Sequence, residues 1–224
     1  MNRVACATRF YICCISHRLK FSQNGDIMKK YTTIVFDLDG TLLDTLEDLT
    51  NSVNYALSQM GYPVRALDEV RFMVGNGVRT LMERAVPTGI CAEAFEKCFA
   101  LFKEYYDAHC NDNTRPYAGI PELLHALKER GYRLAIVSNK IDHAVKALQA
   151  LYFQDVAVAL GEKEGLRRKP DPDMVHAALK ELQVPAAEAV YIGDSDVDIQ
   201  TAVNSGLDCI SVSWGFRDTT TSNA

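Results

Sequence analysis

The sequence predicts an α/β protein: a five-stranded parallel sheet with helices on both faces, plus an all-helical insertion after the first strand. Three observations support this prediction. Five short apolar runs alternate with amphipathic segments, and parallel strands require crossover connections of that kind. Residues 45–114 contain no convincing strand pattern. Reactive polar side chains fall where the predicted strands end, which is where such sheets bind ligands.

The first strand is predicted over Tyr31–Phe36, where β-branched and aromatic residues form a continuous apolar run. Two carboxylates follow it directly, in the segment Asp37-Leu38-Asp39-Gly40-Thr41. Gly40 permits a sharp turn and Thr41 adds a hydroxyl, so carboxylates, free amides and a hydroxyl converge on one small volume. Such a place suits a cation and an anion together. A solvated acidic turn would explain one aspartate but not the whole run.

The predicted helical insertion begins at Thr45, a candidate N-cap with Asp48 at the third helical position, and its first helix ends at Gly61. After the segment 68–72 and Gly75-Asn76-Gly77, further helices are predicted through 81–85 and from about 91 to 110, the last rich in aromatic residues. The segment Thr114-Arg115-Pro116 closes the insertion.

Helices and strands alternate after the insertion. Apolar runs predict four more strands, at 132–137, 156–160, 189–192 and 209–212. Helical patterns precede and separate them, at 121–130, 142–151, 173–182 and 196–204. Both faces of the resulting sheet are therefore expected to be covered.

The composition excludes several classes of function. The 224 residues are 48% hydrophobic and 24% charged, as in ordinary globular proteins, and the net charge of −5 provides no basic surface for nucleic acid or an anionic membrane. An anionic substrate would therefore need a local cation. No apolar run reaches the roughly 18 residues of a membrane span. The seven cysteines form no Cys-x-x-Cys pair, which favours reduced thiols and a cytoplasmic protein. The sequence predicts no oligomeric state.

Residues 1–27 differ from the rest of the chain, because basic residues interrupt a short apolar stretch that is poorly flanked for a signal segment. We expect them to be a loosely ordered extension, since Met28-Lys29-Lys30 directly precedes the first strand and is similar to a natural start.

Reactive groups follow four of the five predicted strands. They are Asp37 and Asp39 after the first, Ser138-Asn139 after the second, Lys169-Pro170-Asp171-Pro172 in the loop after the third, and Gly193-Asp194-Ser195-Asp196-Val197-Asp198 after the fourth. Each segment alone is a weak signal, because a Lys-Pro pair or a single serine usually marks only a turn. Parallel strands bring all four segments to one edge of the sheet.

In this order and at these spacings, the four segments resemble the four motifs of the haloacid dehalogenase superfamily, whose members are mostly phosphatases. The resemblance covers nearly the whole chain after Met28. It implies a Rossmann-like core formed by residues 28–44 and 115–224. It also implies that residues 45–114 are a helical cap of that superfamily's first subclass, a cap that closes over the strand ends and excludes water.

Charge balance indicates a cofactor. Four ionised carboxylates would repel a phosphate dianion, so Lys169 and a divalent cation must supply positive charge. Oxygen ligands favour Mg²⁺. The resemblance implies a metal site made of the Asp37 carboxylate, the Asp39 backbone carbonyl and the Asp194 carboxylate, with Asp198 behind or beside the ion. Additional help from Ser195 or Asp196 is left open.

The resemblance also implies catalytic roles. Asp37 is the nucleophile that forms an aspartyl-phosphate, and Asp39 acts first as general acid and then as general base. Lys169 balances charge between Asp37 and phosphate. Ser138 binds the phosphoryl oxygens together with amides of the segment Leu38-Asp39-Gly40-Thr41 and of Asn139. The expected substrate is a small phosphorylated metabolite.

The cap loop is expected to add substrate contacts. Gly75-Asn76-Gly77 is small enough to approach the active site, so Asn76 and Gly77 are candidate binding residues. Arg79, or alternatively Arg71, is a candidate partner for a second anionic group on the substrate. The alternative for either arginine is an exposed position without a ligand.

Three segments narrow the resemblance to phosphoglycolate phosphatases: the Gly-Asn-Gly loop, Thr114-Arg115-Pro116-Tyr117-Ala118-Gly119, and Ser213-Trp214-Gly215-Phe216. Alternatives on the same frame are an inorganic pyrophosphatase and a sugar-phosphate phosphatase or phosphomutase. A non-catalytic phosphate-binding module usually lacks Asp39 or a metal carboxylate, and a true dehalogenase lacks a carboxylate at position 39. Ile199 and Ser205, in place of glycine and glutamate, exclude a calcium loop of the EF-hand type beginning at Asp194.

Overall fold

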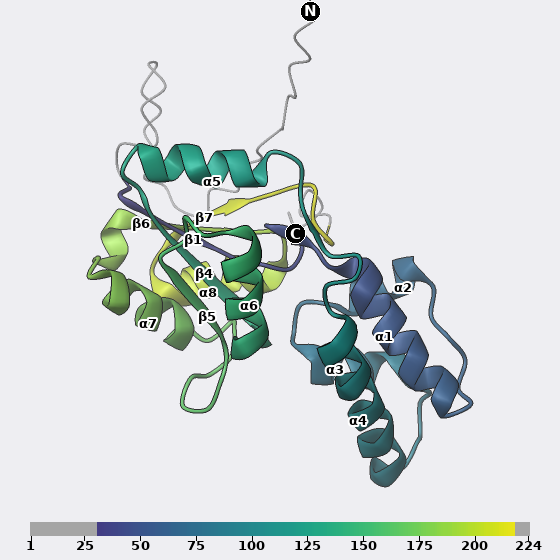
Figure 1. Ribbon diagram of the computed structural model, residues 1–224. Helices are drawn as coiled ribbons and strands as arrows, with labels where there is room; N and C mark the ends of the chain where they lie inside the picture. Colours follow the sequence, from purple (N-terminus) through teal and green to yellow (C-terminus); the bar gives the residue numbers. More distant parts are fainter. Residues whose placement is uncertain (1–30, 218–224) are drawn as a thin grey trace, which may run out of the picture.

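The computed structural model describes residues 31–217, which form a five-stranded parallel sheet with helices on both faces, beside a separate group of helices (Figure 1). The predicted extension, residues 1–27, lies outside the described residues. The sheet order is β5-β4-β1-β6-β7, with strands β1 (Thr33–Phe36), β4 (Arg133–Ile141), β5 (Val158–Glu162), β6 (Ala189–Gly193) and β7 (Asp208–Ser211). All five predicted strands are present, and the predicted fold class is confirmed.

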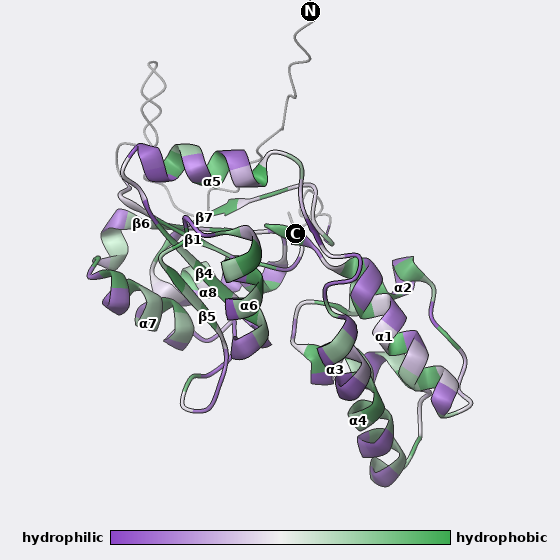
Figure 2. Ribbon diagram, viewed as in Figure 1, coloured by the Kyte–Doolittle hydropathy of each residue, from purple (hydrophilic) through white to green (hydrophobic). Residues whose placement is uncertain are grey.

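Alternation along β1 explains how both faces of the sheet are covered. Ile34 and Phe36 face a cluster that contains residues of α5 (Ile120–Glu129) and α6 (Asp142–Tyr152). Val35 faces the opposite cluster, with residues of α7 (Asp173–Leu182) and α8 (Asp196–Ser205). Because successive strand residues point to opposite faces, a strand buried on both sides is apolar throughout. The hydrophobic strands between the two helical layers are visible in Figure 2.

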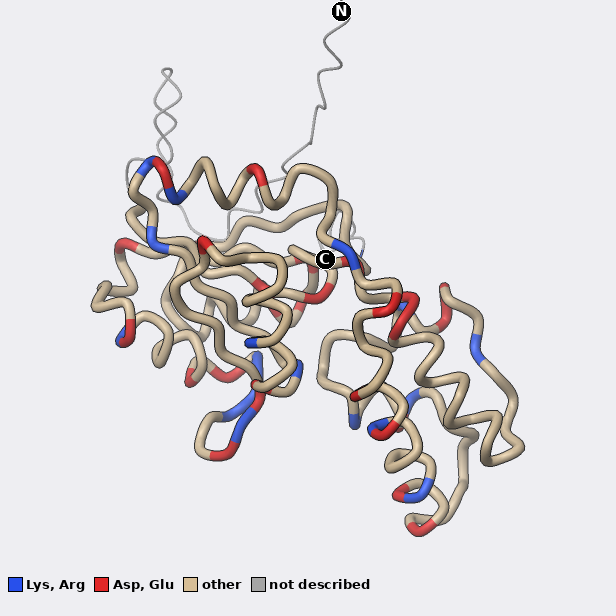
Figure 3. Tube along the Cα trace, in the orientation of Figure 1, with Lys and Arg blue, Asp and Glu red and all other residues tan. Residues whose placement is uncertain are grey.

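The central position of β1 in the sheet brings the polar residues that follow three neighbouring strands close together. Phe36, at the end of β1, pairs with Ile136 of β4 on one side and Ile192 of β6 on the other. The residues that follow these three strands therefore meet at one edge of the sheet. Charged residues concentrate in the helices and loops around the sheet, including the loop after β5 (Figure 3).

The helical insertion has a hydrophobic core of its own. It comprises α1 (Leu46–Gln59), α2 (Leu67–Met73), α3 (Val78–Ala85) and α4 (Ala92–His109), called the cap helices below. Val53, Leu57 and Phe102 are fully buried among them, and Phe216 joins this cluster from the loop after β7. On the basis of these separate cores, we propose that residues 45–114 are a unit distinct from the sheet-containing core, of which the structure describes residues 31–44 and 115–217.

The chain enters and leaves the cap helices through neighbouring segments. Strand β2 (Leu43–Asp44) pairs antiparallel with β3 (Arg115–Pro116), a short ladder that the sequence pattern did not predict. The predicted capping role of Thr45 is wrong in its chemistry, because its hydroxyl makes no cap hydrogen bond. Asp48 instead accepts hydrogen bonds from the backbone amides of Asn113 and Thr114, at 2.8–3.0 Å, and from the Thr114 hydroxyl.

We expect Asp48→Ala to lower the free energy of unfolding by roughly 2–4 kcal/mol, because the substitution leaves several buried donors without an acceptor. Urea denaturation would measure this change. Glu47→Ala is the matched control, since Glu47 is an exposed carboxylate in the same helical turn, and its expected effect is within about 0.5 kcal/mol. Equal unfolding midpoints for the two variants would contradict a structural role for Asp48.

None of the helices within residues 31–217 combines the length and apolar content required to cross a membrane.

Candidate active site

The turn after β1 brings Asp37 and Asp39 to the edge of the sheet. The Gly40 amide donates to the carbonyl of Leu43 at 2.8 Å, and Gly40 adopts a positive φ of +88° that favours glycine. A Cβ at this position would also lie 2.5 Å from Oδ2 of Asp194. Two features of the turn therefore require glycine at position 40: its backbone conformation and its close approach to Asp194.

Asp194 follows β6 and lies between two loops. Its Oδ1 is 3.3 Å from the Thr41 hydroxyl, and its Oδ2 accepts a hydrogen bond from the backbone amide of Phe216 at 2.7 Å. A Cβ on Gly215 would reach this carboxylate at 2.4 Å, so the loop after β7 also packs directly on it. Burial, together with repulsion from Asp198, raises the pKa of Asp194 to about 7.

Lys169 lies between two carboxylates at the centre of the site. Its Nζ is 2.7 Å from Oδ1 of Asp37 and 2.8 Å from Oδ1 of Asp198, and its side chain is only 3% exposed. Burial disfavours a charged ammonium, but attraction to Asp198 and Asp37 outweighs burial and raises the pKa of Lys169 well above its usual value. Lys169 therefore carries a positive charge beside Asp37.

Asp198 is held on both carboxylate oxygens. Oδ1 accepts from Lys169 and from the hydroxyl of Tyr191 at 3.1 Å, while Oδ2 accepts from the amide and hydroxyl of Ser195. Ser195 is in turn the N-cap of α8. These contacts fix Asp198 and make it suited to orienting Lys169 from behind.

The carboxylates of Asp37, Asp194 and Asp198 fit a divalent cation. One oxygen from each lies within 4.8 Å of the others, and all three residues are buried. Three carboxylates facing the single ammonium of Lys169 leave an excess of negative charge. Burial and the charge of Asp198 raise the pKa of Asp37 well above its usual range. A bound cation would offset this excess of negative charge. An oxygen-only donor set of this kind suits Mg²⁺.

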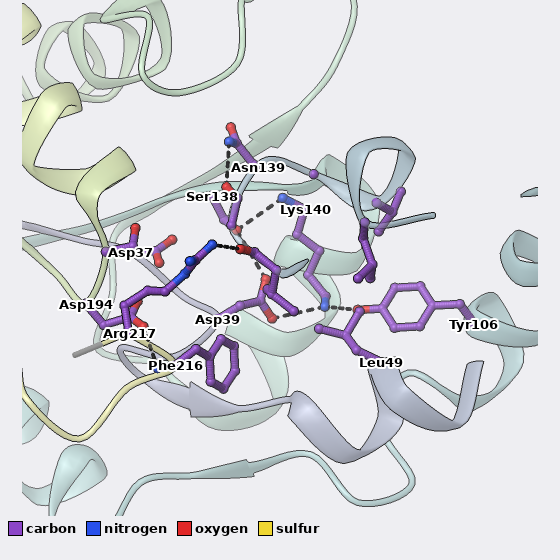
Figure 4. Close-up of a pocket in the computed structure, with 16 residues that line it drawn as sticks. Asp37, Asp39, Leu49, Tyr106, Ser138, Asn139, Lys140, Asp194, Phe216 and Arg217 are labelled. Carbon is purple, nitrogen blue, oxygen red and sulfur yellow. Dashed lines mark hydrogen bonds and ion pairs between the residues drawn. The ribbon is translucent and has the colours of Figure 1, made fainter. Parts of the chain in front are cut away.

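Asp39 contacts a second buried lysine, which sequence reasoning missed. Lys140 Nζ lies 3.2 Å from Oδ1 of Asp39 and donates a hydrogen bond to the hydroxyl of Tyr106 on α4 (Figure 4). The Ser138 hydroxyl is 3.5 Å from the other oxygen of Asp39. Burial raises the pKa of Tyr106 to about 12, against the opposing effect of Lys140. Because Lys140 directly follows Ser138-Asn139, the sequence could have indicated that it lies near the site. Nothing in the sequence singled out Tyr106.

The pocket above these residues lies between the sheet edge and the cap helices. The predicted site residues of the sheet edge that line it are Asp37, Asp39, Ser138, Asn139 and Asp194, whereas Lys169 and Asp198 lie outside the lining. The cap side contributes Leu49, Val74, Gly75, Gly77, Val78, Leu81 and Tyr106 (Figure 4). Phe216 and Arg217 also line it, and neither was predicted as a site residue.

The side chain of Asn139 is engaged in hydrogen bonds to two loops and is not free to bind substrate. Its side-chain oxygen accepts from the backbone amide of Lys169 at 2.8 Å, and its amide group donates to the carbonyls of Gly75 and Lys169. Asn139 therefore holds the lysine loop against the cap loop. Asn76 points elsewhere, since its side-chain oxygen accepts from Arg84 and the residue does not line the pocket.

The two arginines predicted to meet a second anionic group lie outside this pocket. Arg79 forms a two-pronged contact with Glu96, at 2.9 and 3.1 Å, with its guanidinium 4.8 Å from the centre of the Phe99 ring. Arg71 is 3.6 Å from Asp68. Neither side chain is placed with the residues at the sheet edge.

Comparisons with known proteins agree with this geometry. The family described as haloacid dehalogenase-like hydrolase matches residues 34–212. A phosphoglycolate phosphatase from Caulobacter vibrioides is 36% identical over 194 residues, covering 83% of this chain and 81% of that protein. One from Pseudomonas savastanoi pv. phaseolicola is 33% identical over 194 residues, covering 82% of this chain and 70% of that protein.

Two solved structures have similar folds. A Lactobacillus delbrueckii subsp. bulgaricus protein, provisionally described as a phosphoglycolate phosphatase, superposes with a TM-score of 0.81 at 38% identity, covering 85% of this chain and 90% of that one. CbbY from Rhodobacter sphaeroides, solved in complex with phosphate, gives a TM-score of 0.62 at 25% identity, covering 80% and 84% of the two chains.

Proposed function

The chain belongs to the haloacid dehalogenase-like hydrolases, and from this premise we propose that it is a Mg²⁺-dependent phosphatase acting on a small phosphomonoester, with 2-phosphoglycolate as the favoured substrate. The observation that carries the proposal is the position of Asp37. Its carboxylate is held 2.7 Å from the Lys169 ammonium and within reach of two further buried carboxylates. A nucleophile, a fixed positive charge and a cation-binding set therefore share one volume.

In the proposed first step, an oxygen of Asp37 attacks phosphorus in line. The bond from phosphorus to the ester oxygen breaks, its electron pair goes to the leaving oxygen, and Asp39 protonates that oxygen. Ser138 and the amides of the turn after β1 hold the phosphoryl oxygens, while Lys169 offsets the charge that spreads over them. The product of this step is an aspartyl-phosphate and a free alcohol.

In the second step, water attacks phosphorus and gives a proton to Asp39, and the bond from phosphorus to Asp37 breaks to regenerate the carboxylate. Asp39 is thus acid and then base, and the Lys140 contact holds its carboxylate in place. Mg²⁺ would be held by the carboxylates of Asp37 and Asp194 and the backbone carbonyl of Asp39. Asp198, whose oxygens accept from Lys169 and Ser195, would lie behind or beside the ion. When bound, the ion supplies the charge that lets a phosphate dianion approach carboxylates.

The substrate assignment is drawn from the relatives that carry the name phosphoglycolate phosphatase. The phosphate in the related CbbY structure supports a phosphorylated ligand. A small phosphorylated metabolite also fits a pocket enclosed by the cap helices. We further propose a cytoplasmic location, where such metabolites occur.

We expect phosphate release from 2-phosphoglycolate in the presence of Mg²⁺, with a kcat/KM above those for inorganic pyrophosphate and hexose phosphates. EDTA should abolish release and excess Mg²⁺ should restore it, because the buried carboxylates need a cation before a phosphate can bind. A panel of phosphate compounds assayed for inorganic phosphate provides the measurement.

The same panel separates the alternatives. A preference for pyrophosphate or a hexose phosphate would overturn the substrate assignment while leaving the phosphatase intact. Interconversion of sugar-phosphate isomers with little phosphate release would indicate a phosphomutase. Failure to release phosphate from any ester, including a generic aryl phosphate, would indicate a binding module.

A further inference from the structure

Arg217 lies at the junction of the catalytic edge and the cap helices. It follows Phe216, whose backbone amide donates to Asp194 and whose ring packs among the cap helices. The Arg217 side chain crosses the pocket, and its Nη2 donates to the carbonyl of Val74 in the cap loop at 3.0 Å (Figure 4). The backbone of this arginine is therefore fixed beside the cation-binding set, and its guanidinium reaches the cap.

Arg217 differs from the other basic residues around the site in its lack of a carboxylate partner. Two basic side chains line the pocket, Lys140 and Arg217, and Lys140 is paired with Asp39. Lys169, deeper in the site, is paired with Asp37 and Asp198. Within residues 31–217, Arg217 makes no ion pair. It is therefore the pocket-lining cation with charge available for a ligand.

The hydrogen bonds of the guanidinium are also incomplete. Nη2 donates to Val74, whereas Nε is shielded from solvent without an acceptor, and Nη1 donates to no acceptor within the described part of the chain. A shielded donor without an acceptor is unfavourable, because it has lost its hydrogen bonds to water without replacing them. An anion that draws the guanidinium toward it would satisfy these donors. Arg71 also has an Nε without a partner, but Arg71 does not line the pocket.

We propose that Arg217 binds a carboxylate on the leaving-group portion of the substrate, an inference that rests on the proposed phosphatase function. The phosphoryl oxygens already have partners at the strand ends, in Ser138, Lys169 and the turn amides. The guanidinium instead reaches toward the cap loop, where the alcohol portion of an ester held at Asp37 would extend. A planar guanidinium matches a carboxylate with two parallel hydrogen bonds. Arg217 thus takes the role that sequence analysis assigned to Arg79 or Arg71.

The test compares two esters that differ only at the second anionic group. 2-Phosphoglycolate carries a carboxylate where 2-hydroxyethyl phosphate carries an uncharged CH₂OH. We expect the wild type to prefer 2-phosphoglycolate. Arg217→Gln should lower kcat/KM for 2-phosphoglycolate by about 10- to 100-fold, mainly through KM, because a charge-assisted hydrogen bond contributes about 1.5–3 kcal/mol. Its kcat/KM for 2-hydroxyethyl phosphate should stay within about threefold, since that ester cannot use the interaction.

Two variants control the comparison. Arg133→Gln removes another guanidinium that donates to a backbone carbonyl, that of Leu182, far from the pocket, and should leave the ratio of the two substrates unchanged. Arg217→Lys keeps the positive charge but loses the planar guanidinium that can donate two parallel hydrogen bonds. The ratio of its kcat/KM values for the two esters should lie between those of the wild type and Arg217→Gln. Retained hydrolysis of 2-hydroxyethyl phosphate verifies that Arg217→Gln is folded.

Three results would overturn the inference: no wild-type preference for 2-phosphoglycolate, an unchanged ratio in Arg217→Gln, or an equal loss with both esters. In each of these cases, Mg²⁺-dependent hydrolysis of 2-hydroxyethyl phosphate by the wild type would leave the proposed phosphatase activity standing. The first result would also overturn 2-phosphoglycolate as the favoured substrate. A wild type that hydrolyses neither ester would overturn both the inference and the proposed function.

Discussion

Replacing Asp37 with asparagine is expected to lower turnover by roughly 10⁴- to 10⁶-fold, the range associated with loss of a covalent nucleophile. The asparagine amide has nearly the shape of the carboxylate, but neither its nitrogen nor its oxygen is nucleophilic enough to attack phosphorus. The amide oxygen can still accept the hydrogen bond from Lys169, so the fold should be retained. Steady-state phosphate release and an acid-quenched assay for protein-bound label from ³²P-substrate would measure the effect.

The matched control for this substitution is Asp44→Asn. Asp44 lies on the same segment of chain but is exposed on β2, so its neutralisation should leave turnover nearly unchanged. Wild-type protein should accumulate label that Asp37→Asn does not. Turnover near the wild-type rate in Asp37→Asn, or label that persists in it, would exclude Asp37 as the nucleophile.

Lys169→Met is expected to affect both turnover and stability. Removal of the ammonium takes away the charge next to the phosphoryl group, and losses of about 10²- to 10³-fold in kcat accompany removal of one stabilising donor. It also leaves Asp37 and Asp198 buried without their shared partner, and breaking a buried pair in this way destabilises by about 3–5 kcal/mol. For a protein of this size, the melting temperature in EDTA should fall by roughly 6–20 °C.

Mg²⁺ should then stabilise Lys169→Met more than it stabilises the wild type, because the cation compensates carboxylates that lysine no longer neutralises. Thermal melts with and without Mg²⁺ would measure the difference. Lys180→Met, at an exposed position on α7, is expected to behave as the wild type does. Equal melting temperatures for Lys169→Met and Lys180→Met in EDTA would contradict the placement of Lys169 between the two carboxylates.

The sheet was predictable from sequence because its strands are buried on both faces. Runs such as Ile34-Val35-Phe36 have no polar position, and glycines or prolines separate them from helices with clear periodicity. The edge at which Asp37, Ser138, Lys169 and Asp194 meet followed from the rule that parallel strands share a carboxyl end. That rule needs only strand order and no side-chain detail.

The contacts between the cap helices and the sheet were not predictable, because they depend on how two separately packed units meet. Tyr106 on α4 contacts Lys140 across that junction. Helix α4 contains several aromatic residues, and nothing in the sequence distinguishes Tyr106 from the others. Arg79 was expected at the pocket but meets Glu96, a partner one helix away. Strands β2 and β3 are too short to produce a hydrophobic pattern, and Asp48 bonds to residues far along the chain.

The pairing of β2 with β3 allows the helical segment between them to change in evolution without changing the sheet. The two connections of the cap helices leave the core side by side, so the core constrains only the spacing of the two crossing points. Lengthening the segment between fixed ends has a small entropic cost, about 0.6 kcal/mol for each doubling. A helical segment of another length or shape should be transplantable between Asp44 and Arg115 without disturbing the turn that carries Asp37. The substrate range could thus diversify by insertion while the catalytic edge is inherited intact.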